Sequence, residues 1–230
     1  MPRIRGHLAE LPTGPDAWAL LNDALFGSNE IGGQSVAVRG EALPWDWSMV
    51  FGRTAPLHLE IGFNRGEFLR TLAAQSPESD FVGVEIRRRF CWRLTHLIGD
   101  DDAAPRNLRI VWADAKIFCP VVFAPGSLAG IYITFPDPWW KKRHFKRRLV
   151  DTPFVKEMAS LLAVGGRVWV KSDVPAVADE IAQSFASSGL FCAPTPFDGD
   201  RLPFTHREVN CIDRGVPIRR FYATRRGPES

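Results

Sequence analysis

The chain has 230 residues, of which 45% are hydrophobic and 24% are charged, so it is long enough for one well-buried α/β domain. With 29 basic and 26 acidic residues the formal charge is only +3, and any affinity for a polyanion must therefore come from local clusters of basic residues. The four cysteines have no metal-ligand spacing, and neither a secretory start nor a stretch of transmembrane length is present, so we expect free thiols, no metal site, no membrane contact and a cytoplasmic protein.

Residues 1–50 are the least informative part of the chain. Asp16 is a candidate N-cap for a short helix that Gly27 would end, and the glycines and prolines that follow indicate an irregular segment. We therefore predict a partly ordered N-terminal arm at residues 1–50 and a single domain at residues 51–230.

From residue 57 the pattern becomes that of an alternating α/β protein. Leu57–Ile61 is typical of a strand, Gly62–Gly66 of a tight turn, and Glu67–Gln75 of a helix with one apolar face. Because glycine has no Cβ, the backbone of such a turn can pass close to a ligand, and the following helix offers free N–H groups. The third glycine of the dinucleotide fingerprint is absent, which disfavours a nicotinamide-dependent oxidoreductase.

The second predicted strand, Phe81–Glu85, ends in a carboxylate. An acid at this point can accept hydrogen bonds from both hydroxyls of a ribose, as in proteins that bind nucleoside cofactors. The alternative is that Glu85 is exposed to solvent and paired with Arg87 or Arg88. Both interpretations stay open at this stage.

A helix at Arg87–Gly99 and a third strand at Leu108–Trp112 are expected next. Asp114 lies just beyond that strand, where it can reach the adenine amino group of the same cofactor or act only as a helix cap. The inner apolar stripe of the helix is expected at Phe90, Leu94 and Leu97.

The most distinctive stretch begins with a buried strand at Ile131–Phe135. Pro136-Asp137-Pro138 cannot continue a ladder, so the chain turns out of the sheet and leaves Asp137 at the carboxyl end of the strand. Trp139 and Trp140 place a π surface beside this carboxylate, which suits binding of a flat base. The alternative is an ordinary turn residue, since aspartate is common in turns.

Six of the eight residues from Lys141 to Arg148 are lysine or arginine. Such a run can bind the phosphates of a nucleic acid next to Asp137, although it can also be a solvated basic face or a targeting patch. The combination with a carboxylate and two aromatic residues favours nucleic-acid binding.

The remaining pattern continues the alternation of helices and strands. Thr152 is expected to cap a helix that runs through Leu162 and ends at Gly165-Gly166, and Asp173 follows a fifth strand at Arg167–Lys171. The last elements are expected as a helix at Ala176–Ser187, a strand at Leu190–Ala193 and a final strand at Pro217–Thr224. This series predicts one sheet with a single ligand-binding edge, where four acids converge: Glu60, Glu85, Asp114 and Asp137.

From about Leu57 to Phe221 these motifs resemble the bacterial tRNA (guanine-N7-)-methyltransferase family. The most specific shared motif is Phe135–Trp139 with the basic run after it. The others are Glu60-Ile61-Gly62, Gly83-Val84-Glu85-Ile86, Lys171-Ser172-Asp173 and Thr205-x-x-Glu208 with Gly215. The resemblance implies a class I (Rossmann-like) methyltransferase domain with a seven-stranded, mostly parallel sheet and helices on both faces. It further implies S-adenosylmethionine as cofactor and a guanine in the tRNA variable loop as target.

The resemblance also implies a role for each matching residue. Asp137 would be the catalytic residue. The cofactor would be bound by Glu60, Gly62, Gly66, Glu85, Asp114 and Asp137, and the substrate by Lys141, Asp173, Thr205, His206, Arg207 and Glu208. The RNA would be contacted by Arg143, His144, Phe145, Lys146, Arg147 and Arg148. The protein would be a monomer or weak homodimer. Asn64 stands where the family usually has a second glycine, and asparagine tolerates the left-handed backbone angles of such a turn.

Guanine N7 has a lone pair and no proton, so methyl transfer to it needs placement rather than a general base. We expect Asp137, with Asp173 or Glu208, to accept hydrogen bonds from guanine N1–H and the 2-amino group. Two alternatives remain: methylation of an exocyclic amine of RNA, and a non-catalytic RNA-binding module with a vestigial cofactor fold.

Overall fold

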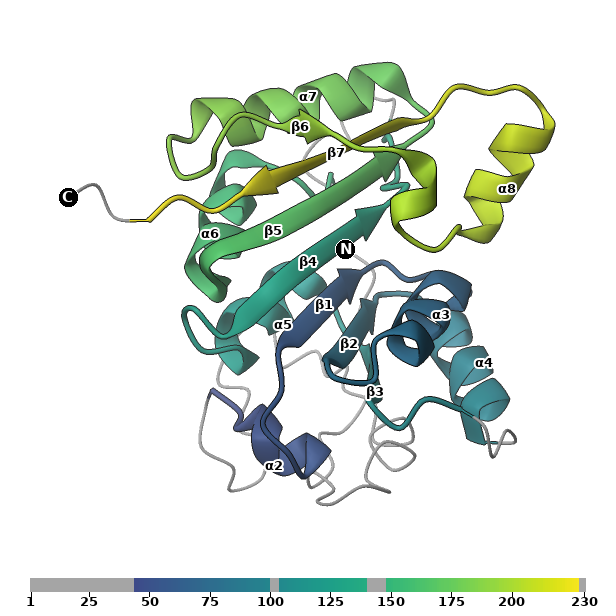
Figure 1. The fold of residues 1–230 in the computed structure, drawn as a ribbon, viewed down its shortest axis with the longest axis vertical. Coiled ribbons are helices and arrows are strands. Elements are labelled where there is room, and N and C mark those ends of the chain that lie inside the picture. Colours follow the sequence, from purple (N-terminus) through teal and green to yellow (C-terminus); the bar gives the residue numbers. More distant parts are fainter. Residues whose placement is uncertain (1–43, 100–103, 140–147, 228–230) are drawn as a thin grey trace. The chain divides into compact units, whose positions relative to one another are not determined.

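The computed structural model describes residues 44–99, 104–139 and 148–227 (Figure 1). The chain divides after Ala124 into two compact units. The strand order is β3-β2-β1 in the first unit and β4-β5-β7-β6 in the second, and only β7 runs antiparallel to its neighbours. The predicted seven-stranded, mostly parallel α/β fold is confirmed.

In the first unit the strands are joined by helices, as parallel pairing requires. β1 pairs with β2 from Leu57↔Asp80 onward, and β2 pairs with β3 from Phe81↔Leu108 onward. The predicted bounds of β1, α3 and β3 are confirmed to the residue. The elements are α2 (Trp47–Phe51), β1 (Leu57–Ile61), α3 (Glu67–Gln75), β2 (Asp80–Glu85), α4 (Arg88–Gly99), β3 (Leu108–Trp112) and α5 (Ala115–Val122).

In the second unit, α6 and α7 lie behind β5 and β7 in the view of Figure 1, and α8 lies beyond the carboxyl ends of β4 and β5. Val168, Val170 and Ala223 are fully buried on the helix-covered face of these strands. The elements are β4 (Leu128–Thr134), α6 (Thr152–Leu161), β5 (Leu162–Ser172), α7 (Pro175–Ser187), β6 (Thr195–Pro196), the 3-10 helix η2 (Gly199–Arg201), α8 (His206–Asp213) and β7 (Arg219–Thr224).

The short helix α2 is joined to the rest of the first unit by aromatic packing and by a buried arginine. Trp47 stacks on Phe123 at a centroid distance of 4.9 Å, and its Nε1–H donates to the carbonyl of Val122. Arg109 of β3 is fully buried, donates to the carbonyl of Val50 at 2.9 Å and lies 4.5 Å from the Phe51 ring centroid. Burial lowers the pKa of Arg109 to about 10, so it remains cationic at neutral pH.

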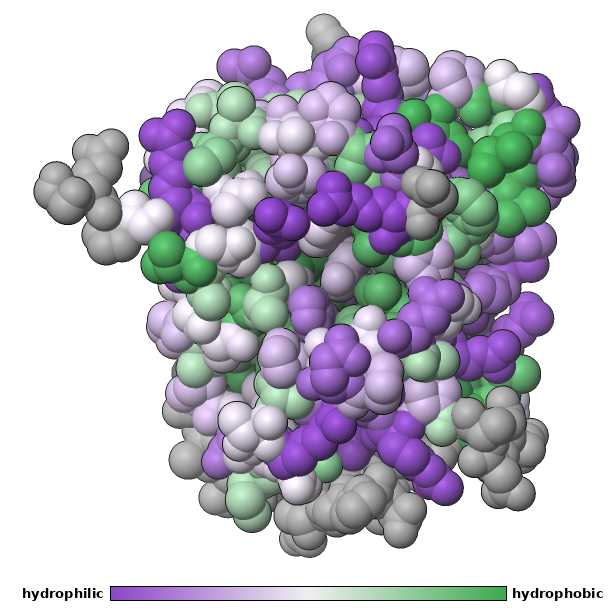
Figure 2. Space-filling view, in the orientation of Figure 1, coloured by the Kyte–Doolittle hydropathy of each residue, from purple (hydrophilic) through white to green (hydrophobic). Residues whose placement is uncertain are grey.

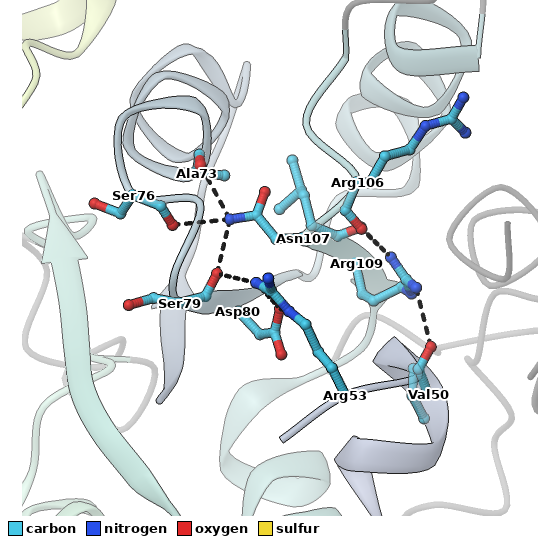
Figure 3. A network of polar contacts seen from close by, with 10 residues as sticks. Val50, Arg53, Ala73, Ser76, Ser79, Asp80, Arg106, Asn107 and Arg109 are labelled. Carbon is cyan, nitrogen blue, oxygen red and sulfur yellow. Dashed lines mark hydrogen bonds and ion pairs between the residues drawn. The ribbon is translucent and has the colours of Figure 1, made fainter. Parts of the chain in front are cut away.

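A second set of polar contacts ties the turn after α3 to β3, as Figure 3 shows. The Asn107 amide donates to three carbonyls, those of Ala73, Ser76 and Ser79, at 2.7 to 3.0 Å. Arg53 forms an ion pair with the buried Asp80 at 2.7 Å. These side chains satisfy backbone groups that would otherwise be buried without partners.

Two sequence predictions for α4 and α6 are wrong in detail. On α4 the buried stripe is Cys91, Leu94 and Ile98, whereas Leu97 is 45% exposed. Apolar residues lie on more than one face of this helix, so the sequence alone does not show which face is buried. The N-cap of α6 is Asp151, whose side chain accepts from Phe154 N–H at 3.0 Å.

The glycine pair at residues 165 and 166 does not end a helix. It lies inside β5, which begins directly after α6, and the register with β4 shifts between Leu128 and Gly130. Gly165 has a φ of +81°, which explains why a glycine occupies this position. The strand expected at Leu190–Ala193 is reduced to a single bridge between Phe191 and Arg225, and the pairing resumes only at β6.

The boundary predicted at residue 50 remains a prediction, and the helix expected after Asp16 lies outside the described residues. Trp45, Trp47 and Val50 lie before that boundary and are buried in the first unit. No helix in the described part of the chain combines the length and apolar character needed to cross a lipid bilayer.

We expect the free energy of unfolding to decrease as the pH is lowered, because of His58. Its ring stacks on Phe81 at 5.1 Å, and burial lowers its pKa from 6.5 to about 4. The pKa of His58 is lower in the folded protein than in the unfolded chain. The stability that depends on the neutral ring is therefore complete above pH 6.5 and is lost as the pH falls from 6.5 to 4. The loss is roughly 1.4 kcal/mol per pH unit, or about 2 kcal/mol at pH 5.

Urea unfolding at pH 7 and pH 5 measures this loss. His58→Gln should reduce the difference between the two pH values, while the control His96→Gln, on the exposed side of α4, should leave it as in the wild type. An equal pH dependence in all three proteins would contradict the assignment.

Candidate functional site

In the first unit the Glu85 carboxylate is buried at the end of β2 and its orientation is fixed. Oε2 accepts from the Asn64 N–H at 3.0 Å, and Oε1 accepts from the Arg87 N–H at 2.8 Å and from Arg87 Nε at 3.2 Å. The pair with Arg87, one of the alternatives, is therefore present, but Glu85 is only 1% exposed. Three of the four lone pairs of the carboxylate are in use, so Oε2 can accept one further hydrogen bond.

The turn between β1 and α3 has three residues with positive φ: Gly62 (78°), Asn64 (52°) and Gly66 (79°). Asn64 therefore adopts the left-handed conformation that the sequence led us to expect. A Cβ on Gly66 would lie 2.3 Å from Leu94 Cδ2, so this glycine is required for packing against α4. A Cβ on Gly62 would meet no atom within 4 Å, which leaves open space beside the backbone.

Glu60 and Asp114 come from the neighbouring strand ends. Glu60 is buried at the penultimate position of β1, and Asp114 caps α5 by accepting from the Lys116 N–H at 3.0 Å. Parallel pairing brings the ends of β1, β2 and β3 to one edge, since Ile61 pairs with Val84 and Glu85 with Trp112. The first unit thus presents three acids and an open glycine turn along one edge, which fits the adenosine part of a nucleoside cofactor.

In the second unit Asp137 is exposed and follows β4 in an unusual backbone conformation. Phe135 and Trp139, two residues away on either side, have φ values of 52° and 41°. Bulky residues rarely adopt positive φ, and such conformations cluster at functional sites. The Phe135 N–H donates to the carbonyl of Lys171 at 2.7 Å, so the first residue of this turn is hydrogen-bonded to β5.

Asp173, Arg207 and Phe135 come together from β5, α8 and β4. Arg207 donates to Asp173 Oδ2 through Nη2 at 2.7 Å and through Nε at 3.1 Å. Its guanidinium lies 5.7 Å from the Phe135 ring centroid. The structure therefore brings two predicted substrate residues, Asp173 and Arg207, close to the turn that bears Asp137.

Thr205 and Glu208 form a capping box at the start of α8. The Thr205 hydroxyl accepts from the Glu208 N–H at 3.0 Å, and the Glu208 carboxylate accepts from the Thr205 N–H at 3.4 Å. Glu208 also pairs with Lys171 at 2.7 Å and with Arg220 at 2.8 Å, and it has no exposed surface. Glu208 thus holds α8 in place, whereas His206 and Arg207 are exposed on the same helix.

Sequence reasoning missed α8 itself and the roles of Lys171 and Arg220. The pattern Thr205-x-x-Glu208 is a capping box signature, so a helix start was detectable. A lysine directly after the apolar run Val168-Trp169-Val170 was a second signal, because a buried ammonium requires an acidic partner. The identity of that partner, 37 residues further on, was not evident from the sequence.

Six of the residues predicted to bind substrate or RNA lie outside the described part of the chain: Lys141, Arg143, His144, Phe145, Lys146 and Arg147. Arg148 is described; it is 17% exposed and paired with Glu180 of α7. The four cysteines are free thiols, as expected, and the described residues include no cluster of His, Cys, Asp and Glu able to hold a metal ion.

The fold and the strand-end acids define a class I, S-adenosylmethionine-dependent methyltransferase. Among solved structures the chain is similar to the 16S rRNA methyltransferase KamB, with a TM-score of 0.55 and 16% identity over 76% of this chain and 90% of that one. It is also similar to an S-adenosylmethionine-dependent O-methyltransferase from Thermotoga maritima, with a TM-score of 0.53 and 14% identity over 76% and 61% of the two chains. At these identities the similarity establishes the fold.

Sequence comparison defines the family. A family model described as "Putative methyltransferase" matches residues 54–197. A tRNA (guanine-N(7)-)-methyltransferase from Synechococcus sp. (strain JA-3-3Ab) is 38% identical, over 80% of this chain and 78% of its own. One from Burkholderia mallei (strain ATCC 23344) is 40% identical, over 67% and 58%.

The chain belongs to the bacterial tRNA (guanine-N7-)-methyltransferase family. The predicted family, enzyme class and cofactor, S-adenosylmethionine, are confirmed. The roles assigned to individual residues remain predictions.

Glu208→Gln should destabilise the protein strongly, because it leaves Lys171 and Arg220 without the anion they share. We expect the free energy of unfolding to fall by about 3–5 kcal/mol, as for other broken buried ion pairs. Urea unfolding measures the change. The control Asp213→Asn, at the exposed end of α8, should stay within about 0.5 kcal/mol of the wild type.

The double variant Lys171→Met, Glu208→Gln should lose less stability than the sum of the two single changes, since it removes both charges of one pair. Additive losses would show that the two side chains are not coupled.

Proposed function

We propose that the protein transfers the methyl group of S-adenosylmethionine to N7 of a guanine in the variable loop of tRNA. The observation that carries this proposal is Asp137: an exposed carboxylate at the end of β4, between two aromatic residues with positive φ. Family membership supports the substrate and the atom. We further propose that the protein acts in the cytoplasm as a monomer or weak homodimer.

The cofactor would be bound by residues of the first unit. Glu85 is suited to a ribose hydroxyl, because its carboxylate is already oriented by two backbone N–H groups and Oε2 can accept one further hydrogen bond. Asp114 would accept from the adenine amino group, Glu60 would line the pocket, and Gly62 offers the open backbone that a bulky ligand needs. When bound, S-adenosylmethionine supplies an electrophilic methyl group on a sulfonium.

Asp137 would bind the target base. Its carboxylate would accept hydrogen bonds from guanine N1–H and the 2-amino group, which fixes the direction of the N7 lone pair. N7 carries no proton, so no general base is required, and the gain comes from orientation. The methylated ring is cationic, and a nearby carboxylate stabilises the positive charge that develops during transfer.

Asp173 and Arg207 would act together on the substrate. Arg207 has five N–H donors, and its pair with Asp173 uses two of them, so the others can bind the phosphate or base edge of a nucleotide. Glu208 has no exposed surface and is paired with Lys171 and Arg220, so its proposed contribution is to hold α8 rather than to touch the base. Trp139 would stack on a base that is splayed out of the tRNA fold.

The direct test is to incubate the protein with unmodified tRNA and labelled S-adenosylmethionine and to locate the methyl group by mass mapping. We expect 7-methylguanosine in the variable loop. A methyl group on an exocyclic amine would support the alternative chemistry instead, and absence of transfer with retained tRNA binding would support a non-catalytic RNA-binding module.

Asp137→Ala should lower kcat by at least about 100-fold, because it removes the group that orients the base and stabilises developing charge. The Kd for S-adenosylmethionine, measured by calorimetry, should change by less than about threefold, since this ligand is bound mainly by the first-unit residues. Asp179→Ala, an exposed acid of α7, is the control. Equal losses in turnover and cofactor binding would contradict an orienting role.

A further inference from the structure

One face of the sheet formed by β5 and β7 points away from α6 and α7, and α8 covers its Lys171–Arg220 end through Glu208. Figure 1 shows α6 and α7 on the other side of these strands. Antiparallel pairing places Trp169 opposite Tyr222, with Arg167 opposite Thr224 and Lys171 opposite Arg220. Because side chains alternate along a strand, these six share one face, on which Lys171 is buried beneath α8. Figure 2 shows hydrophilic residues gathered over β5 on this side.

Two arginines lie against the aromatic pair at the centre of this face. The Trp169 and Tyr222 rings are 4.9 Å apart. The Arg167 guanidinium lies 4.8 Å from the Tyr222 centroid and 5.8 Å from that of Trp169. Arg201 of η2 lies 5.5 Å from Trp169 and 5.9 Å from Tyr222. Contact with an aromatic ring holds a guanidinium in place and leaves its N–H edge available, which suits phosphate binding.

A hollow of about 440 Å³ lies beside Arg201 and is lined by Pro196, Phe197, Asp198 and Arg201. This volume is within the range of pockets that hold small ligands, so the hollow can admit an unpaired nucleotide. Asp198 is the acid in this lining, and it can accept hydrogen bonds from base amino groups.

The charge balance of this face favours a polyanion. Glu208 lies beneath it but is buried and neutralised by Lys171 and Arg220. Arg220 also lies close to η2, since a Cβ on Gly199 would be 3.2 Å from its guanidinium carbon. Arg167, Arg201 and Arg220 therefore lie close to β7 and η2 in this unit.

We propose that the arginine–aromatic face (Arg167, Trp169, Arg201 and Tyr222) is a second tRNA-binding surface, on which Arg167 and Arg201 bind backbone phosphates. A sheet face with aromatic rings and cationic side chains is a common platform for RNA. This surface shares no residue with the turn that bears Asp137 or with the run Lys141–Arg148. The inference rests on the proposed function, which supplies tRNA as the polyanion.

The experiment measures binding of unmodified tRNA to the full chain at several salt concentrations, together with methyl transfer. Arg201→Gln should weaken tRNA binding roughly five- to tenfold near 0.1 M salt and reduce the slope of log affinity against log salt by about 1. Arg167→Gln, Arg201→Gln should reduce it by about 2. Cofactor affinity and kcat at saturating tRNA should stay unchanged.

The matched control is Lys156→Gln, which removes one positive charge from the exposed side of α6, on the helix-covered face of the same unit. Wild-type affinity and salt slope in Arg201→Gln, or equal effects in Lys156→Gln, would overturn the proposal. A changed oligomeric state with unchanged tRNA affinity would assign the face to contacts between copies and would also overturn it. If the wild type binds tRNA but transfers no methyl group to it, the proposed function fails while the binding measurements still test this surface; if the wild type does not bind tRNA, both fail.

Discussion

The second unit depends on one buried carboxylate. Glu208 accepts from Lys171 of β5 and Arg220 of β7 and also closes the cap of α8, so one side chain joins two strands to a helix more than thirty residues away from Lys171. A buried charge is costly unless it is paired and hydrogen-bonded, and here both conditions are met. The consequence for function is positional. α8 carries Arg207, and Arg207 reaches Asp173 just after β5, so the geometry of these two residues, for which we propose a substrate role, follows from the buried pair of Lys171 and Glu208.

In the first unit the buried carboxylate of Glu85 is stabilised by backbone N–H groups. Glu85 is as buried as Glu208, but its oxygens accept from the N–H groups of Asn64 and Arg87, which lie in the turn after β1 and just after β2. Asn64 has a φ of 52°, and its N–H donates to Glu85 Oε2 at 3.0 Å. The departure from the family's glycine at this position is therefore compatible with the turn, and the side chain of residue 64 remains exposed. Buried acids in this protein are positioned by fixed donors, and the exposed Asp137 is positioned by its backbone.

The sequence predicted what depends on local pattern and missed what depends on distant partners. The strands at Leu57–Ile61 and Leu108–Trp112 and the helix at Glu67–Gln75 were correct to the residue, because alternation, apolar periodicity and the glycine turn all agree there. The phase of α4 was wrong because apolar residues occupy several of its faces. The sequence does not reveal the role of Lys171, since its partner Glu208 is brought to it by tertiary structure. Thr205 and Glu208 were expected to touch substrate, yet the capping box and the ion pairs give both a structural explanation.

Glu208 and Asp137 both stand in family motifs, but their surroundings differ. A residue can match a family motif because it touches the ligand or because it holds the element that does. Glu208 is fully buried with every oxygen engaged, whereas Asp137 is exposed between Phe135 and Trp139, whose positive φ values require support from the surrounding structure. Part of that support is visible in the hydrogen bond from Phe135 to the Lys171 carbonyl. Lys171 therefore contributes twice: its backbone holds the turn that bears Asp137, and its side chain holds the helix that bears Arg207.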